Sequence, residues 1–268
     1  MQTFEPDSKL VNRVVPSPNH GPRRRSKLKQ GDPARPDLII LHYTGMKTAE
    51  GALMRLTAAE AEVSSHYLVL EDGTILQLVP EERRAWHAGV SYWHGETDIN
   101  SRSIGIEIVN PGHEFGYPPF PPRQIEAVIA LCRDIMRRQR IPSAGVLAHS
   151  DIAPSRKSDP GEKFPWSRLH RFGVGVWARP VPIRNGGILK IGNRGPAVVE
   201  LQRALASWGF GIRITGRFDA ATRDVVAAFQ RRYRPARVDG RADPSTIATL
   251  QRLAAQVGFH RRSRGVLV

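Results

Sequence analysis

The chain has 268 residues, 40% of them hydrophobic, and this length and composition allow a substantial core in one large or two modest domains. Its single cysteine, Cys132, excludes an intrachain disulfide. No apolar run approaches the roughly 20 residues of a membrane-spanning helix. The N-terminus carries neither a hydrophobic signal region nor a lipobox cysteine, so we expect a cytoplasmic protein.

The formal charge of +15 raises the question of nucleic-acid binding, because clustered Lys and Arg neutralise phosphates. The densest basic cluster spans residues 23–29, within a Pro-rich N-terminal arm that we assign to residues 1–30. This cluster has no interleaved aromatic residues and no nucleic-acid motif beside it. We therefore expect no nucleic-acid partner, and we attribute the charge to compositional bias or to attraction toward an anionic polymer.

The segment 31–177 combines strand and helix patterns. Helical spacing of apolar residues predicts helices over 49–61 and 124–138, with Cys132 as a core residue on the apolar face of the second. Asp72-Gly73 predicts a hairpin between two strands. The expected fold class is α/β, a mixed β-sheet flanked by helices. The predicted strands are residues 38–41, 66–70, 74–79, 104–109 and 145–148.

A Pro- and Gly-rich stretch at 178–187 predicts a linker to a second unit. Beyond it, apolar residues at helical spacing predict three short helices, near residues 198–205, 220–233 and 244–253. Asp219 and Asp243 are placed to begin the second and third of these. We therefore expect a small C-terminal three-helix domain over 188–256, followed by a basic tail over 257–268.

Two histidines each follow a predicted buried strand. His42 closes one strand, His149 follows another, and Asp159 lies ten residues further on a Pro- and Gly-shaped loop that can fold back. Two imidazoles and one carboxylate, with a fourth tetrahedral position open to water, are typical of a catalytic zinc site. For either histidine alone, the simpler interpretation is a strand-end side chain capped by hydrogen bonds. The three residues together favour the metal site.

Glu107 and Lys157 are the candidates for the general base and for the group that stabilises an oxyanion. Glu107 occupies the opposite strand face from its isoleucine neighbours, and a carboxyl in such an apolar strand is costly unless it faces a polar cleft. Burial would raise its proton affinity toward the range of a general base. The alternative is an outward-facing Glu on a half-solvated strand. Lys157, two residues before Asp159, would stabilise an oxyanion, and its alternative is an ordinary solvated lysine.

These segments resemble the zinc-dependent N-acetylmuramoyl-L-alanine amidases of the AmpD and AmiD type. The resemblance rests on LHYT around His42, GIEIVN around Glu107 and AHSDIAPSRKSDPGEKFPW around His149, and it covers roughly residues 37–177. It implies that His42, His149 and Asp159 are the zinc ligands. It also implies that Glu107 is the catalytic base and that Lys157 stabilises the tetrahedral intermediate.

Two further segments, SHYLV at 65–69 and RAWHAG at 84–89, are similar to family segments around the cleft. They give four candidate substrate contacts when Asn110 of GIEIVN is included: His66, Trp86, His87 and Asn110. His66 and His87 are equally compatible with supporting or purely packing roles. Members of this family also act in the periplasm, which is the alternative to a cytoplasmic location.

The C-terminal unit resembles the three-helix peptidoglycan-binding domain appended to cell-wall hydrolases. The resemblance rests on VELQRAL, GRFDAAT, AFQ and VDG, whereas Thr215 and Ala242 replace an Asp and a Gly expected in two turns. If this domain is a tethered anchor, a chain ending near Ala178 keeps its rate on a soluble muramyl-peptide and loses binding to the wall. The alternative is a degenerate domain that only packs on the amidase.

The resemblance implies hydrolysis of the amide between N-acetylmuramic acid and the L-alanine of the stem peptide, with Zn²⁺ as the cofactor and peptidoglycan or muropeptides as the partner. The alternative function is a non-catalytic module that binds peptidoglycan or muropeptides. A third interpretation is a zinc hydrolase for another acyl-amino bond. The sequence leaves open whether intact sacculi or anhydro-muropeptides are preferred, and it leaves the oligomeric state open.

Overall fold

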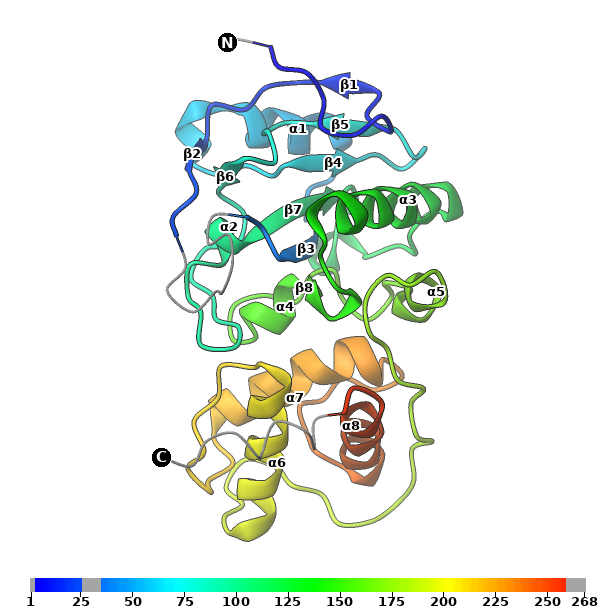
Figure 1. The fold of residues 1–268 in the computed structure, drawn as a ribbon. Helices are drawn as coiled ribbons and strands as arrows, with labels where there is room; N and C mark the ends of the chain where they lie inside the picture. Colours follow the sequence, from blue (N-terminus) through cyan, green and yellow to red (C-terminus); the bar gives the residue numbers. More distant parts are fainter. Residues whose placement is uncertain (1–2, 26–34, 259–268) are drawn as a thin grey trace.

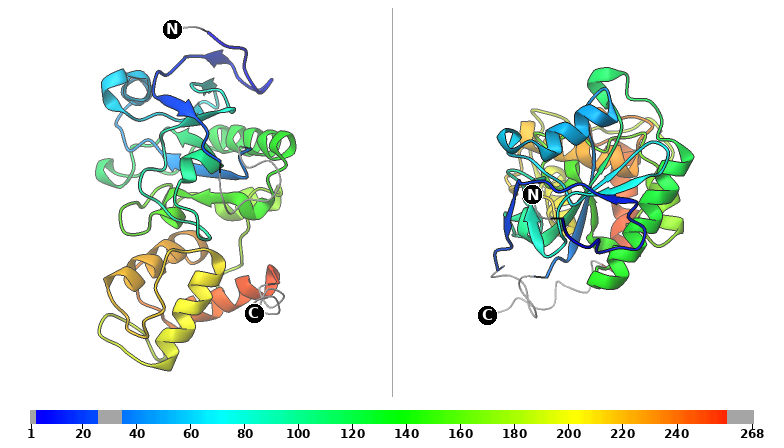
Figure 2. Two further views of the ribbon diagram at one scale, coloured as in Figure 1. Left: turned by 60° about the vertical axis from the view of Figure 1, so that its left-hand side comes forward. Right: turned by 90° about the horizontal axis from the view of Figure 1, so that it is seen from above.

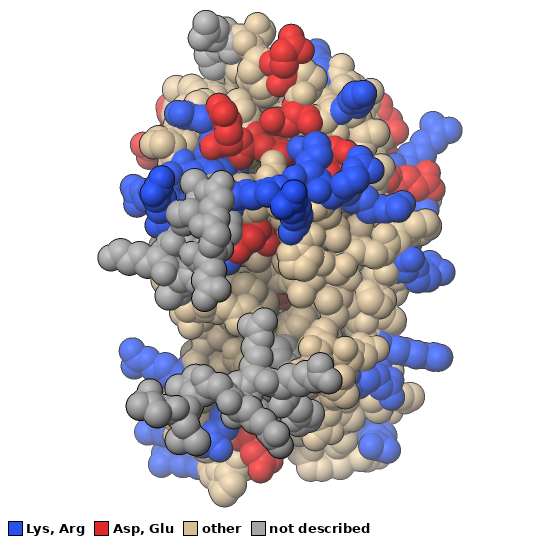
Figure 3. Space-filling view, viewed as in Figure 1, with Lys and Arg blue, Asp and Glu red and all other residues tan. Residues whose placement is uncertain are grey.

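The computed structural model describes residues 3–25 and 35–258. A sheet with helices on both faces forms the upper part of the molecule in Figure 1, and three helices form the lower part. Within the described ranges, no helix is both long enough and apolar enough to cross a membrane. Figure 3 shows Lys and Arg gathered in a band across the upper part, with Asp and Glu intermixed.

The main sheet has six strands in the order β1-β5-β4-β7-β3-β8, which is mixed as expected. The four strands from β4 to β8 in this order are mutually parallel, while β5 runs antiparallel to β4 and parallel to β1. The β4–β5 pair is the predicted hairpin, closed by a turn at Asp72-Gly73. The strands are β1 (Arg13–Val14), β3 (Leu38–Tyr43), β4 (Tyr67–Val69), β5 (Ile75–Gln77), β7 (Ser103–Ile108) and β8 (Val146–Ala148).

Two helices cover opposite faces of this sheet, as Figure 2 shows from above. Helix α3 (Pro122–Gln139) packs on the face that carries Ile39 and Leu41, and it contributes Cys132 to that core. Helix α1 (Ala49–Thr57) packs on the other face through Leu56. β3 is buried on both faces, and its continuous apolar run is the sequence signature of that position.

Helix α1 is shorter than predicted. It ends at Thr57, and residues 59–61 form the separate 3-10 helix η1 (Ala59–Ala61), because the cap residue Ala58 is extended. Other short elements were not predicted from the sequence, since segments of three to six residues show little periodicity. They are β2 (His20–Pro22), β6 (Arg83–Ala85), α2 (Ile99–Arg102), η2 (His113–Phe115), η3 (Ser143–Gly145), α4 (His149–Ile152) and α5 (Trp166–Arg171).

The segment predicted as a basic N-terminal arm is built into the sheets over its described part. β1 pairs with β5, and β2 pairs antiparallel with β6. Arg23, from the densest basic cluster, donates to the backbone carbonyls of Glu81, Asn100, Ser101 and Ser103. Burial is the main cause that lowers the pKa of Arg23 to about 10. Residues 26–30 of this segment lie outside the described residues.

The C-terminal unit has the three predicted helices, α6 (Pro196–Trp208), α7 (Ala220–Tyr233) and α8 (Pro244–Gln256). Asp219 caps α7 by accepting from the Thr222 backbone N–H, and Asp243 caps α8 by accepting from that of Thr246. Both caps are the expected ones. Most of the predicted basic tail, residues 259–268, lies outside the described residues.

The two units share one hydrophobic core. A single cluster of buried side chains joins Leu38, Ile40 and Leu147 of the sheet to residues of all three C-terminal helices. The Trp93 ring meets those of Trp208 and Phe210 edge-on, with ring centroids 6.2 and 5.5 Å apart. The linker therefore joins two units that are packed together rather than held apart (Figure 1).

A chain ending at Ala178 should be markedly less stable than the full chain. Each large apolar side chain newly exposed costs about 1.5–3 kcal/mol, against a typical domain stability of about 5–15 kcal/mol. We expect the melting temperature to fall by more than about 10 °C, given roughly 2–4 °C per kcal/mol at this size. Differential scanning calorimetry of both chains checks this, and equal melting temperatures would show that the shared core contributes little.

Candidate active site

The carboxyl ends of three parallel strands bring the predicted site residues together. His42 lies near the end of β3, where it is the register partner of Glu107 on β7. β8 runs parallel on the other side of β3, and His149 directly follows it as the first residue of α4. Side chains in register on neighbouring strands point to the same face. The sheet therefore places these residues on one side of one edge.

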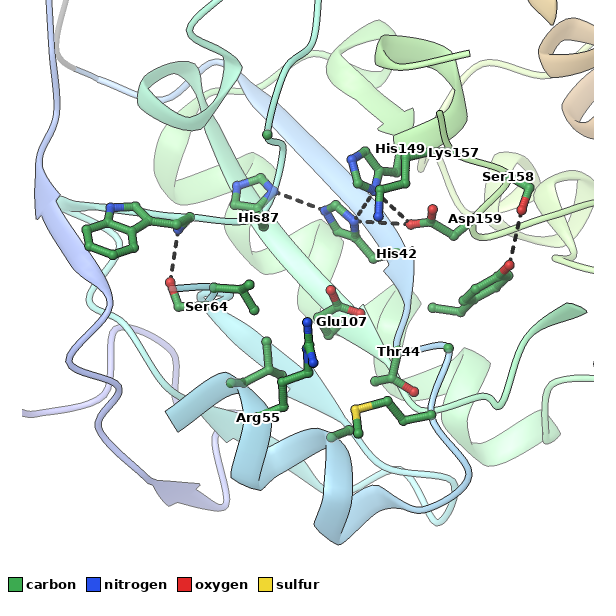
Figure 4. A pocket seen from close by; sticks show the side chains of 18 of the residues that line it. His42, Thr44, Arg55, Ser64, His87, Glu107, His149, Lys157, Ser158 and Asp159 are labelled. Atoms are coloured by element: carbon green, nitrogen blue, oxygen red, sulfur yellow. Dashed lines mark hydrogen bonds and ion pairs between the residues drawn. The ribbon is translucent and has the colours of Figure 1, made fainter. Parts of the chain in front are cut away.

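His42, His149 and Asp159 form a tight buried cluster, shown in Figure 4. The two Nδ1 atoms of the histidines are 2.9 Å apart. Asp159 Oδ2 lies 3.0 Å from His149 Nδ1 and 3.2 Å from His42 Nδ1. All three side chains are buried. Three lone-pair atoms this close repel one another unless a cation or a proton lies among them, so the cluster has the donor set and spacing of a metal site.

A chain of hydrogen bonds sets which nitrogen of His42 carries the proton. The Ile99 carbonyl can only accept, so Ser103 Oγ donates to it at 2.6 Å and accepts from His87 Nε2 at 3.2 Å. His87 Nδ1 is then an acceptor, and His42 Nε2 donates to it at 3.0 Å. His42 Nδ1 is left with a bare lone pair facing Asp159 and His149, as a metal ligand requires.

His149 is oriented in the same way by a backbone carbonyl. Its Nε2 lies 3.1 Å from the Ala88 carbonyl oxygen, so Nε2–H donates and Nδ1 faces the cluster with its lone pair. Arg156 donates to that same carbonyl at 2.8 Å and to the carbonyl of Val90 at 2.9 Å. Arg156 thus fixes the loop that orients His149.

The protonation states suit a cationic ligand. Burial, followed by the charge of His149, lowers the pKa of His42 to about 4, so its imidazole is neutral at pH 7. Burial alone would raise the pKa of Asp159, but the two histidines lower it below its ordinary value and keep the carboxylate ionised. Neutral imidazole and carboxylate are the forms that bind metals.

Glu107 is enclosed beside this cluster, with its carboxyl turned toward it in Figure 4. Burial, followed by the charge of Asp159, raises its pKa well above 4.5. Its Oε2 is buried and has no hydrogen-bond partner among residues 3–25 and 35–258. A carboxyl with a raised pKa and an unengaged oxygen is suited to accept a proton from a bound reactant.

The cluster opens into a cleft of about 720 Å³, into which Lys157 also points. Figure 4 draws the Lys157 side chain beside the cluster of His42, His149 and Asp159. The lining includes residues from β3, β7, α1 and the loops after β6 and β8: His42, Arg55, Trp86, His87, Glu107, His149, Arg156, Lys157 and Asp159. The Glu107 carboxyl, the Lys157 amine and the cluster of His42, His149 and Asp159 therefore face one cavity.

Comparison with known proteins identifies this arrangement. Residues 32–162 match the family model for N-acetylmuramoyl-L-alanine amidase, and residues 194–250 match the model named "Putative peptidoglycan binding domain". N-acetylmuramoyl-L-alanine amidase AmiD of Escherichia coli is 37% identical over 239 residues, which are 82% of this chain and 83% of that protein. The chain belongs to the N-acetylmuramoyl-L-alanine amidase family.

Solved structures agree with this assignment. The complex of Escherichia coli AmiD with the substrate anhydro-N-acetylmuramic acid-L-Ala-D-gamma-Glu-L-Lys has a TM-score of 0.72 and 35% identity, covering 88% of this chain and 94% of that one. AmpDh3 from Pseudomonas aeruginosa also has a TM-score of 0.72, with 29% identity over 96% of this chain and all of that one. Both likenesses extend beyond the catalytic part of the amidase.

Two of the four candidate substrate contacts face the cleft of the amidase and two do not. Trp86 and His87 line it. His66 is fully buried behind it, where its Nδ1 accepts from the Gly105 backbone N–H and its Nε2 lies 3.1 Å from Arg23. Asn110 is buried and donates to the Pro118 carbonyl. These two side chains support the cleft wall instead of lining the cavity.

Other residues around the cleft of the amidase were not singled out from the sequence. Tyr43 places its hydroxyl 3.1 Å from Ser158 Oγ and 2.9 Å from His113 Nδ1. His113 lines the cleft and pairs with Glu162 at 3.0 Å. Their only sequence signal is proximity to the quoted motifs: Tyr43 follows His42, and Ser158 precedes Asp159.

Proposed function

We propose that this amidase hydrolyses the amide between N-acetylmuramic acid and the L-alanine of a stem peptide, with a zinc ion held by His42, His149 and Asp159. The observation that carries the proposal is the convergence of their three buried ligand atoms within 3.2 Å of one another. Tetrahedral zinc with ligands at about 2.0–2.2 Å separates neighbouring ligand atoms by about 3.3–3.6 Å. A zinc ion there would polarise the scissile carbonyl and acidify the attacking water.

The substrate assignment is supported by relatives with the same arrangement of domains. Escherichia coli AmiD is an N-acetylmuramoyl-L-alanine amidase, and its structure was solved with an anhydro-muramyl tripeptide substrate. AmpDh3 was solved with an anhydromuramic pentapeptide. A cleft of about 720 Å³ is of the size that encloses a ligand of this class.

Glu107 acts as the general base in this proposal. Its carboxylate takes the proton of the attacking water and then delivers it to the nitrogen of the leaving L-alanine amine. No described residue hydrogen-bonds to Oε2, which leaves that oxygen available to the reactant. The raised pKa makes the proton transfer favourable near neutral pH.

Lys157 supplies the positive charge that the oxyanion of the tetrahedral intermediate needs. Lys157→Met should lower kcat by about 10²–10³-fold, the usual cost of removing one oxyanion donor. KM should change little, because the charge acts on the oxyanion and not on the ground-state carbonyl. Steady-state hydrolysis of a soluble muramyl-peptide measures both constants.

The matched control is Lys47→Met, because Lys47 lies over the Phe115 ring and is not among the residues that line the cleft. It should retain the wild-type kcat. A kcat for Lys157→Met within about threefold of wild type would remove Lys157 from the chemistry and leave the oxyanion to other groups.

A non-catalytic muropeptide-binding module is the alternative, and it is disfavoured because the three ligands, Glu107 and Lys157 all face one cleft. Mass spectrometry of products from an anhydro-muramyl tripeptide tests both alternatives. We expect free anhydro-N-acetylmuramic acid and a peptide with an L-alanine N-terminus, no turnover in chelator, and recovery on zinc addition. Binding without cleavage would favour the module, and cleavage at another bond would reassign the substrate.

The C-terminal domain is proposed to bind peptidoglycan. The two departures from the expected turn residues leave its turns intact. The Thr215 backbone N–H donates to Gln202 Oε1 at 2.9 Å, and Ala242 pairs with Leu189 in an isolated bridge. Sedimentation of the full-length protein with purified sacculi tests this. Recovery of the protein in the pellet supports the proposal, and its retention in the supernatant contradicts it.

A further inference from the structure

Arg232 of helix α7 crosses from the C-terminal domain into the catalytic domain. Its side chain is 1% exposed. Nη1 donates to Asp151 Oδ2 at 2.5 Å, and Nη2 donates to the carbonyl oxygens of Val146 at 3.1 Å and Val176 at 3.0 Å. The guanidinium also lies over the Trp166 ring, 4.0 Å from its centroid. A planar, forked cation is required to make all four contacts at once.

Two of these contacts end on the short segment that carries His149. Val146 begins β8, and Asp151 lies in the turn of α4 that follows. Asp151 Oδ2 also accepts from the Ala148 backbone N–H at 2.9 Å, which fixes the backbone immediately before His149. Arg232 therefore braces the segment on both sides of this ligand.

The same turn holds the loop of the third ligand. The Ser150 backbone N–H donates to the Asp159 carbonyl at 3.0 Å. Ser150 lies between His149 and Asp151, so the turn that Arg232 braces positions two of the three ligands. A displacement of α4 would move His149 and Asp159 relative to His42, which β3 holds independently.

Asp151 depends on Arg232 for its charge balance. Its side chain is fully buried, and within the described residues it forms an ion pair with Arg232 alone. Its Oδ1 is buried and lacks a hydrogen-bond partner in the part of the chain that the structure describes. Removal of the guanidinium would leave an uncompensated carboxylate inside the turn, and the turn would have to shift to hydrate it.

We infer that Arg232 is a positioning residue of the metal centre, supplied by the peptidoglycan-binding domain. It acts through Asp151 and the β8–α4 segment, and it does not touch the ligands. The inference rests on the proposed zinc site and gives the C-terminal domain a second role besides binding the wall. Metal affinity, and not only attachment to the polymer, depends on this domain.

The test compares zinc affinity in full-length variants by competition with a chromophoric chelator. Arg232→Met should weaken zinc binding by about tenfold or more, the range found when a group that orients metal ligands is removed. The visible spectrum of the Co²⁺-loaded variant should also change, because the ligand geometry changes. The matched control is Arg234→Met, since Arg234 is equally buried but pairs with Asp243 inside the C-terminal domain.

Two further variants separate positioning from simple loss of folding. Arg232→Lys keeps a cation beside Asp151, and the double variant Asp151→Asn/Arg232→Met removes both charges. Their zinc dissociation constants should lie between those of the wild type and Arg232→Met. If Arg232→Met is not recovered folded, these two decide the question, and wild-type affinity in both would overturn the inference.

Wild-type zinc affinity and an unchanged Co²⁺ spectrum in folded Arg232→Met would likewise overturn it. Failure of the proposed function would look different, because the wild-type chain itself would then bind no zinc in this assay. Equal weakening by Arg234→Met would also contradict the inference, since that variant disturbs the C-terminal domain without touching the β8–α4 segment.

Discussion

His42→Ala and Asp159→Ala should each abolish bound zinc and hydrolysis together. Each substitution removes one of three protein ligands from a buried site, and such a site rarely retains its metal with two. We expect about one zinc per chain in the wild type, as for a single catalytic site, and a metal content close to background in both variants. Elemental analysis by mass spectrometry, run beside hydrolysis of a muramyl-peptide, measures the two quantities on the same samples.

His170→Ala is the matched control, because His170 lies on α5 and bonds the Gly175 carbonyl away from the cleft. It should retain zinc and activity. Full activity of Asp159→Ala without bound metal would show that the cluster is structural. Retained zinc with no activity would place the metal elsewhere and give Asp159 a different role.

Glu107→Gln should keep the zinc and lose most of the turnover. The amide has nearly the same shape but cannot accept the proton, so kcat should fall by about 10²–10⁴-fold. Zinc content and zinc affinity should match those of the wild type, since Glu107 is not one of the clustered ligands. Glu126→Gln, an exposed position on α3, is the control for the substitution itself.

The stability of the metal-free protein gives Glu107→Gln a second readout. Burial raises the pKa of Glu107 above 4.5, so the folded state binds a proton more tightly than the unfolded state. The wild type therefore loses stability relative to the Gln variant as the pH rises above about 4.5, and the two are similar below it. Melting temperatures in chelator at pH 4 and pH 8 measure this. If Glu107→Gln turned over substrate at the wild-type rate and were no more stable than the wild type at pH 8, Glu107 would be neither a buried carboxylate nor the general base.

The sequence predicted that His42, His149 and Asp159 would lie close together because its signals are local. The apolar runs before His42 and His149 mark two buried strands, and parallel strands bring their carboxyl ends to one edge of the sheet. The alternation of isoleucines with other residues around Glu107 likewise indicated which face of the strand its side chain occupies. The loop after His149 was predicted without its helical turn α4, because four residues give no periodicity.

The supporting contacts could not be predicted, since they join residues far apart in the chain. The His87–Ser103–Ile99 chain depends on a close approach of His87 to β7, where a Cβ at Gly105 would lie 2.5 Å from the His87 ring. Arg232 meets Asp151 across 81 positions, and in its own helix it reads as an ordinary basic residue of the last turn. Residue spacing within one helix or strand does not reveal contacts between residues so far apart in the chain.

The composition of the linker indicated a C-terminal domain that could be removed without affecting the catalytic domain. Because the two units share a core, removing it would also affect the catalytic domain. A chain ending near Ala178 would lose the partners of Leu38, Ile40 and Leu147 as well as the guanidinium beside Asp151. Its activity on a soluble muramyl-peptide should therefore fall together with its binding to sacculi. Separating the two roles of this domain needs point substitutions in the full chain.

The position of zinc in the protein tests the proposed site of His42, His149 and Asp159 most directly. Diffraction data collected from zinc-loaded crystals above and below the zinc absorption edge should give one strong anomalous peak per chain in the cleft. We expect that peak at about 2.0–2.2 Å from His42 Nδ1, His149 Nδ1 and an Asp159 oxygen. A peak held by other residues, or no peak in a hydrolytically active crystal form, would contradict it.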